Sequence, residues 1–294
     1  MEPRKVNNKN TQVLACIDGA TLTESVCDYA AWVSQKTDTP LTLLHTINHH
    51  QETSDTSDLS GNIGLGSQEH LLEEITSLEQ QQSKLKMQRG KLILQTATDY
   101  LQKQDFNNST STQRHGDLIE AVIDLENSIR VLVLGLRGQA HDKQENKIGA
   151  KLEALIRSLH RPILIVNGEY KQPKQIMIAY DGSSAADKAV EMVASSPLYK
   201  GLTCHLVCVN KNENTATKLL EQATKKLESA DDINVIVTQL KGKADHELCA
   251  YQEKNDIDLT VMGAFSHTRL HDMLLGSFTH KMLVNTKIPL LLLR

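Results

Sequence analysis

The sequence IMIAYDGS at residues 176–183 repeats the pattern of VLACIDGA at residues 13–20. Each stretch is a short apolar run that ends in Asp-Gly, and a segment of helical character follows it at 185–195 and at 23–34. A buried strand that leads through a glycine turn into a helix is typical of a βαβ unit. Because the unit occurs twice, we interpret the chain as an internal repeat.

The repeat continues along both halves of the chain. The matching segments are 41–46 with 204–209, 131–135 with 258–263, and 161–166 with 288–293. The Asp-Gly turns of the two copies are 163 residues apart, but the later strand-end glycines are only 128 apart. The first copy therefore holds about 35 extra residues. We expect domains at 1–168 and 173–294, with a helical insertion at about 48–104 in the first.

The insertion begins with a polar loop at 48–66, and a Gln/Glu/Lys-rich segment follows at 67–104. The apolar residues that recur there at helical spacing are Leu71, Ile75, Leu78 and Leu85. This spacing predicts a helix with a narrow apolar stripe, which Gly90 breaks or bends. A lid and a partner-docking arm are the two roles that we consider for it.

Strands that alternate with helical stretches predict an α/β fold with two doubly wound, parallel, five-stranded sheets of Rossmann-like type. Ligands bind such sheets at the carboxyl ends of the strands, where the strand order reverses. The Asp-Gly after each first strand and the glycine after each fourth strand are expected at those ends. The candidate sites are therefore sought there.

Composition excludes several classes of function. Hydrophobic residues make up 39% of the chain and charged residues 23%, which is typical of a globular protein. The net charge is −4 and aromatic residues are only 3%, so we expect no nucleic-acid partner. No apolar run reaches the roughly 18 residues of a membrane span. Five cysteines without a CxxC pair, and a polar segment at 1–10, favour a reduced, cytoplasmic location.

The glycines of the second half suggest a phosphate site. Gly263 ends an apolar strand, and Gly276-Ser277 opens a helical stretch. Glycine lets the backbone approach a ligand, and the free N–H groups of a helix start attract an anion. A serine hydroxyl there can donate to a phosphate oxygen. A loop whose glycines only satisfy turn geometry is the alternative reading.

Other chemistry has less support. His267, His271 and His280 could share a helical face, but no Cys, Asp or Glu completes a metal site, so we predict none. The sequence lacks a Walker A motif, a Gly-x-Ser-x-Gly elbow and a catalytic Cys with a His partner. We therefore name no catalytic residue.

Both halves resemble universal stress protein domains, over roughly 11–167 and 174–294, and the whole chain resembles the tandem members of that family. The family's nucleotide-binding members carry Gly, two residues, Gly, nine residues, Gly, and then Ser or Thr. The second half matches this motif except that Ser266 replaces the second glycine. The resemblance implies ATP, alone or with Mg²⁺, as the ligand, and we expect at most slow hydrolysis of the bound ATP. It also implies that the C-terminal strands, after Pro162 and Pro289, pair as an internal pseudo-dimer, and a homodimer is a further possibility.

The resemblance also assigns roles to residues of the second half. It places Asp181 at the adenosine end of the nucleotide. It also implies that the backbone of Val209 recognises the adenine base. The implied nucleotide-binding set is Asp181, Val209, Gly263, Ser266, His267, Gly276, Ser277 and Phe278, with Arg269 as a further source of charge.

In the first half the resemblance implies a degenerate site, formed by Asp18, Thr46, Gly135, Arg137, Gly138 and Gly149. Ten residues rather than nine precede Gly149, and Ala150 stands where a hydroxyl is expected. We therefore expect weaker nucleotide binding in this half, or a different ligand.

The resulting interpretation is a cytoplasmic stress-response protein that binds an adenine nucleotide in its second half and acts as a ligand-sensing or signalling module. The alternative is a structural or partner-binding stress protein in which neither half holds a nucleotide. The sequence names no protein partner.

Overall fold

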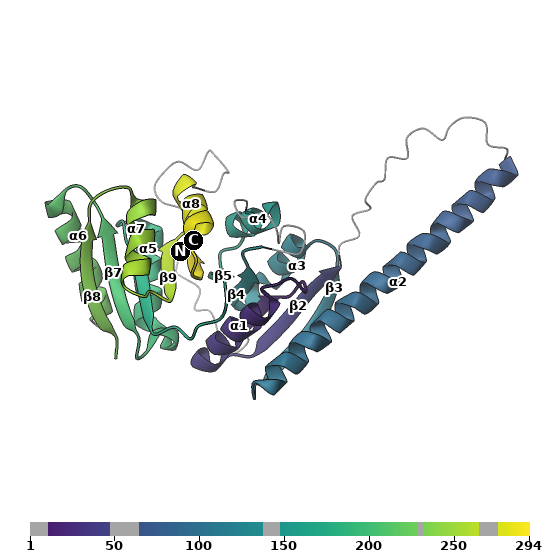
Figure 1. The fold of residues 1–294 in the computed structure, drawn as a ribbon, viewed down its shortest axis with the longest axis horizontal. Coiled ribbons are helices and arrows are strands. Elements are labelled where there is room, and N and C mark those ends of the chain that lie inside the picture. The colour runs from purple at the N-terminus through teal and green to yellow at the C-terminus, as the bar shows by residue number, and fades with distance from the viewer. Residues whose placement is uncertain (1–10, 48–64, 138–147, 229–231, 265–275) are drawn as a thin grey trace.

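We describe a computed structural model of the chain for residues 11–47, 65–137, 148–228, 232–264 and 276–294; the side chains of 65–72 are not described. Ten strands form one continuous sheet in the order β3-β2-β1-β4-β5-β10-β9-β6-β7-β8 (Figure 1). The strands are β1 (Gln12–Cys16), β2 (Leu41–Ile47), β3 (Ser109–His115), β4 (Ile129–Gly135), β5 (Ile163–Val166), β6 (Gln175–Ala179), β7 (Thr203–Val209), β8 (Asn234–Leu240), β9 (Leu259–Gly263) and β10 (Leu290–Leu293).

Each half of the sheet has five parallel strands, and the first strand of each half lies between its second and fourth strands. The strand order reverses at β1 and at β6, so a crevice is expected at the carboxyl ends of these strands. The predicted α/β, Rossmann-like class agrees with this architecture.

The two halves meet at β5 and β10, which pair antiparallel with Leu164 opposite Leu291. All four residues of each strand are buried. The predicted pairing of the two C-terminal strands is therefore confirmed. The prediction of two separate five-stranded sheets needs correction, because this pairing merges them into a single ten-stranded sheet.

Helices cover both faces of the sheet (Figure 1). The helices are α1 (Thr23–Thr37), α2 (Leu65–Lys103), α3 (Leu118–Leu125), α4 (Ala150–Ser158), α5 (Ser184–Ser195), α6 (Glu213–Leu227), α7 (Ala244–Lys254) and α8 (Ser277–Asn285), with short 3-10 turns η2 (Glu126–Ser128) and η3 (Pro197–Tyr199). One hydrophobic cluster packs α1, α2, α5 and α6 on one face, and a second packs α3, α4, α7 and α8 on the other.

The insertion folds largely as predicted, because α2 is one helix of 39 residues. The prediction that Gly90 breaks or bends it was wrong, since the helix continues through that residue. Gly90 is buried where α2 crosses the sheet, and a Cβ there would lie 2.7 Å from His45 Cδ2 and would collide with Gln113 Nε2. The glycine thus allows a close approach of helix to sheet.

Among the described helices, none combines the length and the apolar character that a transmembrane span requires.

Candidate functional site

Each half of the protein has a cavity at the carboxyl ends of its strands. In the C-terminal half a cavity of about 250 Å³ is lined by Asp181, Val209, Gly263 and Phe278. In the N-terminal half a cavity of about 450 Å³ is lined by Asp18, Thr46, Gly135, Arg137, Gly149 and Ala150. The two cavities occupy corresponding places in the two sheets, and most of the sequence-predicted residues that the structure describes line them. The exceptions are Gly276 and Ser277, which directly precede the lining residue Phe278.

Asp181 lies on the turn between β6 and α5. Its Oδ1 accepts a hydrogen bond of 2.9 Å from the backbone N–H of Ser183, and Gly182 at the corner has a φ of +77°. Ser183 caps α5, since its hydroxyl accepts from the N–H of Ala186 at 3.2 Å. The side chain of Asp181 is exposed and borders the cavity, so it can accept a hydrogen bond from a ligand hydroxyl.

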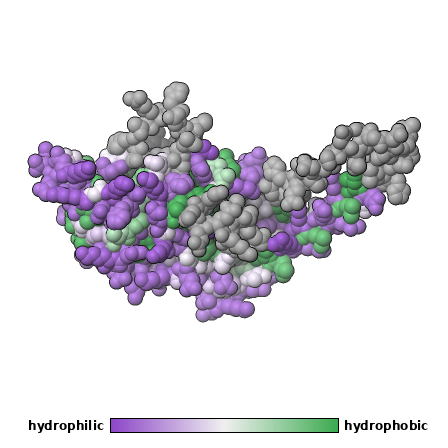
Figure 2. All heavy atoms as spheres, turned by 45° about the horizontal axis from the view of Figure 1, so that its top comes forward, coloured by the Kyte–Doolittle hydropathy of each residue, from purple (hydrophilic) through white to green (hydrophobic). Residues whose placement is uncertain are grey.

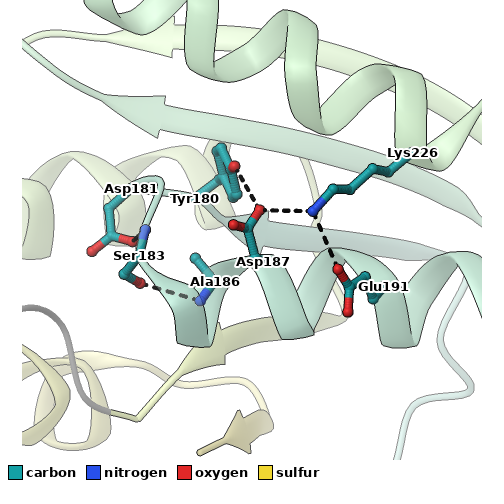
Figure 3. A network of polar contacts seen from close by, with 7 residues as sticks. All are labelled: Tyr180, Asp181, Ser183, Ala186, Asp187, Glu191 and Lys226. Carbon is teal, nitrogen blue, oxygen red and sulfur yellow. Dashed lines mark hydrogen bonds and ion pairs between the residues drawn. The ribbon is translucent and has the colours of Figure 1, made fainter.

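A polar network holds α5 in place behind this turn (Figure 3). Tyr180 donates its hydroxyl proton to Asp187 Oδ1 at 2.9 Å, and Lys226 Nζ of α6 lies 3.1 Å from the same oxygen and 3.2 Å from Glu191 Oε1. Burial, and then the bond to Asp187, raise the pKa of the Tyr180 hydroxyl, which stays protonated as a donor. The network fixes the start of α5, and so it positions the Asp181 turn.

Gly263 ends β9 beside α5, and its packing alone explains why a glycine stands there. A Cβ at Gly263 would lie 2.6 Å from Ala185 Cβ and 3.1 Å from the Ala185 carbonyl carbon. Real Cβ atoms do not approach this closely, so a larger residue would push α5 away from the sheet.

The described residues place no such structural requirement on Gly276. Its φ of −54° suits any residue, and the nearest atom to a Cβ there is Thr279 Oγ1, at 3.9 Å. As the N-cap of α8 it provides no side chain for the free N–H groups of the first turn. Beside it, Ser277 is exposed, and Phe278 lines the cavity. With respect to the described residues, the space at Gly276 is open, and it would accommodate an anionic group at this helix start.

Other predicted site residues fall outside the described parts of the chain. These are Gly138 in the first half and Ser266, His267 and Arg269 in the second. His271 of the possible metal set also lies there, and within the described residues no group of three or more His, Cys, Asp or Glu side chains could hold a metal ion.

The N-terminal cavity repeats the same geometry with different chemistry. Asp18 Oδ1 accepts from the N–H of Ala20 at 2.9 Å, and Gly149 is the N-cap of α4 without a side-chain cap. Arg137 and Lys151 line the cavity, and Lys151 Nζ lies 3.7 Å from Asp117 Oδ2. Ala150 thus stands where the second half has the hydroxyl of Ser277, and the N-terminal cavity has two cations in its lining that the described lining of the other cavity lacks.

Sequence reasoning missed two polar residues of this cavity, Lys151 and His45. His45 Nδ1 lies 2.7 Å from the carbonyl oxygen of Ile17, so the ring is fixed at the end of β1. The signal for Lys151 was its position directly after Gly149-Ala150, in the first turn of α4.

The cavity cysteine is not a nucleophile. Cys16 borders the N-terminal cavity, but burial, and then the charge of Asp18, raise the pKa of its thiol to about 12. Burial likewise raises the pKa of Cys208, whose strand borders the other cavity. A thiol of this kind is protonated near neutral pH, and the thiolate is the reactive form.

Comparison with known proteins identifies the family. The model of the universal stress protein family matches residues 9–167 and again 173–294. This chain is a tandem universal stress protein. The universal stress protein Slr1230 of Synechocystis sp. is 34% identical over 292 residues, which cover 96% of this chain and 99% of the relative. The predicted family membership is therefore confirmed.

Two solved structures share the fold of this universal stress protein over nearly its whole length. A universal stress protein from Archaeoglobus fulgidus has a TM-score of 0.68 at 16% identity, covering 97% of this chain and 99% of that chain. A functionally unknown protein from Pseudomonas aeruginosa has a TM-score of 0.57 at 14% identity, with 97% and 93% covered. At these identities the likeness extends to the fold alone.

Proposed function

We propose that this universal stress protein is a cytoplasmic stress-response protein that binds an adenine nucleotide such as ATP, with the C-terminal half as its tighter site. The observation that carries the proposal is the start of α8. There an uncapped helix N-terminus and an open glycine, Gly276, adjoin a cavity that also holds Asp181 and Val209. Nothing in the described protein requires a glycine at that position, whereas a phosphate group requires the space.

In this proposal, different described residues contact the ribose, the adenine and the phosphates of the nucleotide. The carboxylate of Asp181 accepts hydrogen bonds from the ribose hydroxyls, and the backbone of Val209, at the end of β7, faces the adenine edge. The N–H groups that begin α8 and the hydroxyl of Ser277 donate to the phosphates. If Mg²⁺ accompanies ATP, it binds through the phosphate oxygens, since magnesium is commonly held by substrate phosphates.

Binding without rapid turnover follows from the same residues. The described part of the cavity contains no lysine, no arginine and no carboxylate other than Asp181, which is fixed in its turn. Charge that develops on a transferring phosphoryl group therefore has little stabilisation there. We infer that the protein acts as a sensor, because the fraction of the protein with bound nucleotide follows the nucleotide concentration.

The N-terminal cavity is a second nucleotide site with its own supporting observation. Its volume of about 450 Å³ lies within the range of about 300–1,000 Å³ that small-molecule sites occupy, while the C-terminal cavity is smaller. Lys151 and Arg137 supply positive charge for phosphates. We propose that this site is the weaker one, since Ala150 provides no hydroxyl and its cations are partly exposed to solvent.

Isothermal titration of ATP into the protein tests the proposal. We expect saturable binding that weakens in Gly276→Val, because the new side chain occupies the phosphate space while the backbone at this residue accepts it without strain. Gly149→Val, at the corresponding N-cap of α4, is the matched control for the first half. Absence of binding at millimolar ATP would favour the structural or partner-binding alternative, which the packing role of Gly263 already supports.

A further inference from the structure

Helix α2 has two faces with opposite environments. The buried residues Gly90, Leu94, Ala97 and Leu101 face the protein, and Tyr100 donates its hydroxyl proton to Asp28 of α1 at 2.8 Å. The apolar residues of the other face are exposed: Ile75 by 43%, Leu78 by 53%, Leu85 by 63% and Leu92 by 66%. The helix thus packs on its own domain along one side and presents leucines to solvent along the other.

The arrangement of α2 in space adds to this contrast. Figure 1 shows that its N-terminal part projects beyond the sheet as an arm, and Figure 2 shows separate apolar patches along that arm among polar surface. An isolated helix is only marginally stable in water, and its exposed leucines add no stability until they are buried. Among the described residues of one chain, the arm therefore lacks the packing that normally stabilises a helix.

The spacing of the outer apolar residues matches a coiled coil. Leu71, Leu78, Leu85 and Leu92 follow one another at intervals of seven residues. In heptad terms these are d positions, and Ile75, Gln82 and Arg89 occupy the a positions between them. A strict seven-residue repeat over about three heptads is the pattern of a helix that supercoils with another helix. At 1.5 Å per residue, such a seam is about 30 Å long.

The charges of the arm select its partner. The exposed acidic residues Glu73, Glu74 and Glu79 lie in the first part of this seam, and the exposed basic residues Lys84, Lys86, Arg89 and Lys91 lie in the second. Two copies in parallel would place like charges together. Two copies in antiparallel orientation place the acidic part of each against the basic part of the other, which is favourable.

We propose that the outer face of α2 is a homodimerisation surface, on which a second copy of this chain binds as an antiparallel two-stranded coiled coil. In this arrangement Leu85 packs against Gln82 of the partner subunit. Glu79 faces Lys86 of the partner subunit, and two-fold symmetry places two such pairs near the middle of the seam. The polar Gln82 and Arg89 at a positions favour one register, as buried polar residues do in coiled coils. The dimer leaves both cavities outside the interface.

The oligomeric state of the full-length protein tests the surface. Sedimentation velocity over the micromolar range should give a species of about twice 32.7 kDa. The double variant Leu78→Ala/Leu85→Ala should weaken the dimer at least about a hundredfold, because each substitution removes a buried side chain from both helices. Gln80→Ala, on the opposite side of the arm, is the matched control and should leave the dimer intact.

Helicity provides a second measurement that does not depend on mass. Dissociation should lower the far-UV helical signal of the arm, while the thermal transition of the sheet domains stays in place, since the substituted leucines are exposed in the single chain. A protein that is monomeric throughout the concentration range would overturn the proposal. So would a dimer that the leucine double variant does not weaken.

Charge reversal tests the orientation. Glu79→Lys and Lys86→Glu should each weaken the dimer about tenfold or more, by placing like charges opposite each other. Their combination should restore most of the affinity, because the two positions face each other only in the antiparallel arrangement. If the combined variant is weaker than either single variant, the antiparallel partner is wrong.

Discussion

The two cavities of this tandem universal stress protein occupy the same place in two copies of one fold, yet they treat an anion differently. The C-terminal cavity offers Ser277 and an open N-cap at Gly276, while the N-terminal cavity offers Lys151 and Arg137 around nearly twice the volume. Neutral donors hold a phosphate by direct hydrogen bonds, whereas half-exposed cations act through charge that salt screens. The two cavities therefore share a location in the repeated fold and differ in the groups that they offer to an anion.

The largest expected effect is on ATP affinity at the C-terminal site. Gly276→Val should weaken binding there about a hundredfold, because it removes the approach of phosphate to the N–H groups of α8, and a hydrogen bond to a charged group is worth about 1.5–3 kcal/mol. Gly276→Ala, which adds only one methyl group into open space, should have a smaller effect. Titration calorimetry measures both variants, and equal affinity of Gly276→Val and wild type would contradict the comparison.

The next effect distinguishes the two strand-end glycines by stability. Gly263→Ala should lower the free energy of unfolding by about 1–3 kcal/mol, because its Cβ would lie 2.6 Å from Ala185 Cβ. Gly135→Ala in the other half should cost less than about 0.5 kcal/mol, since its nearest contacts, to Leu22 and the Arg137 carbonyl oxygen, are at 3.4 Å. Urea denaturation compares the two variants. Similar losses of unfolding free energy in both variants would show that packing does not require a glycine at position 263.

A smaller effect concerns salt and Lys151. In the Gly276→Val background only the N-terminal site should bind ATP, so its affinity can be measured separately. There Lys151→Gln should weaken ATP binding about three- to tenfold and reduce the dependence of the affinity on ionic strength. The control is Lys281→Gln, because Lys281 and Asp245 form an ion pair of 3.7 Å, equal in length to that of Lys151 with Asp117. A salt dependence that Lys151→Gln does not alter would remove the charge-based account of this site.

The smallest effect is a difference in acid sensitivity between the halves. Burial lowers the pKa of His205 from its usual 6.5, and the ring contacts the Tyr251 hydroxyl at 2.9 Å. The unfolded chain then binds the proton at higher pH than the folded one, so stability is full above pH 6.5 and is lost as the pH falls through that value. Thr42, at the corresponding strand position of the first half, does not titrate.

Substitution of His205 measures how much this residue contributes to the pH dependence of the unfolding free energy. His205→Gln should reduce the pH slope of unfolding free energy between about pH 6.5 and 5.5 by up to about 1.4 kcal/mol per pH unit. His246→Gln, at an exposed histidine, is the control for general effects of removing a titrating group. An unchanged slope in His205→Gln would assign the acid sensitivity to other residues.

The sequence predicted the elements, and it pointed to the strand ends where the two cavities lie, because both depend on local patterns. Alternating apolar runs and Asp-Gly turns indicated the parallel strands, and the glycines after them indicated the strand ends. The pairing of β5 with β10 was expected from the family resemblance, but the merging of the two halves into a single ten-stranded sheet was not. For β5 and β10 the residues show only that each strand is apolar; their register comes from the packed structure.

Gly90 and Lys151 show why the rest could not be predicted. A glycine within a helical segment indicates weakness when only the helix is considered, but at Gly90 the contacts with His45 and Gln113 decide, and these residues are distant in sequence. Lys151 lines a cavity whose opposite wall comes from β1 and β2. In both cases the role of the residue depends on neighbours that are distant in the sequence and that only the fold brings close.

The most direct test of the central comparison is a calorimetric titration of ATP into the wild type, Gly276→Val and Gly149→Val under one set of buffer conditions. We predict a tight and a weak site in the wild type, loss of the tight site in Gly276→Val, and loss of the weak site in Gly149→Val. Loss of the tight site in Gly149→Val, with Gly276→Val unchanged, would contradict the account and assign the main nucleotide site to the N-terminal cavity.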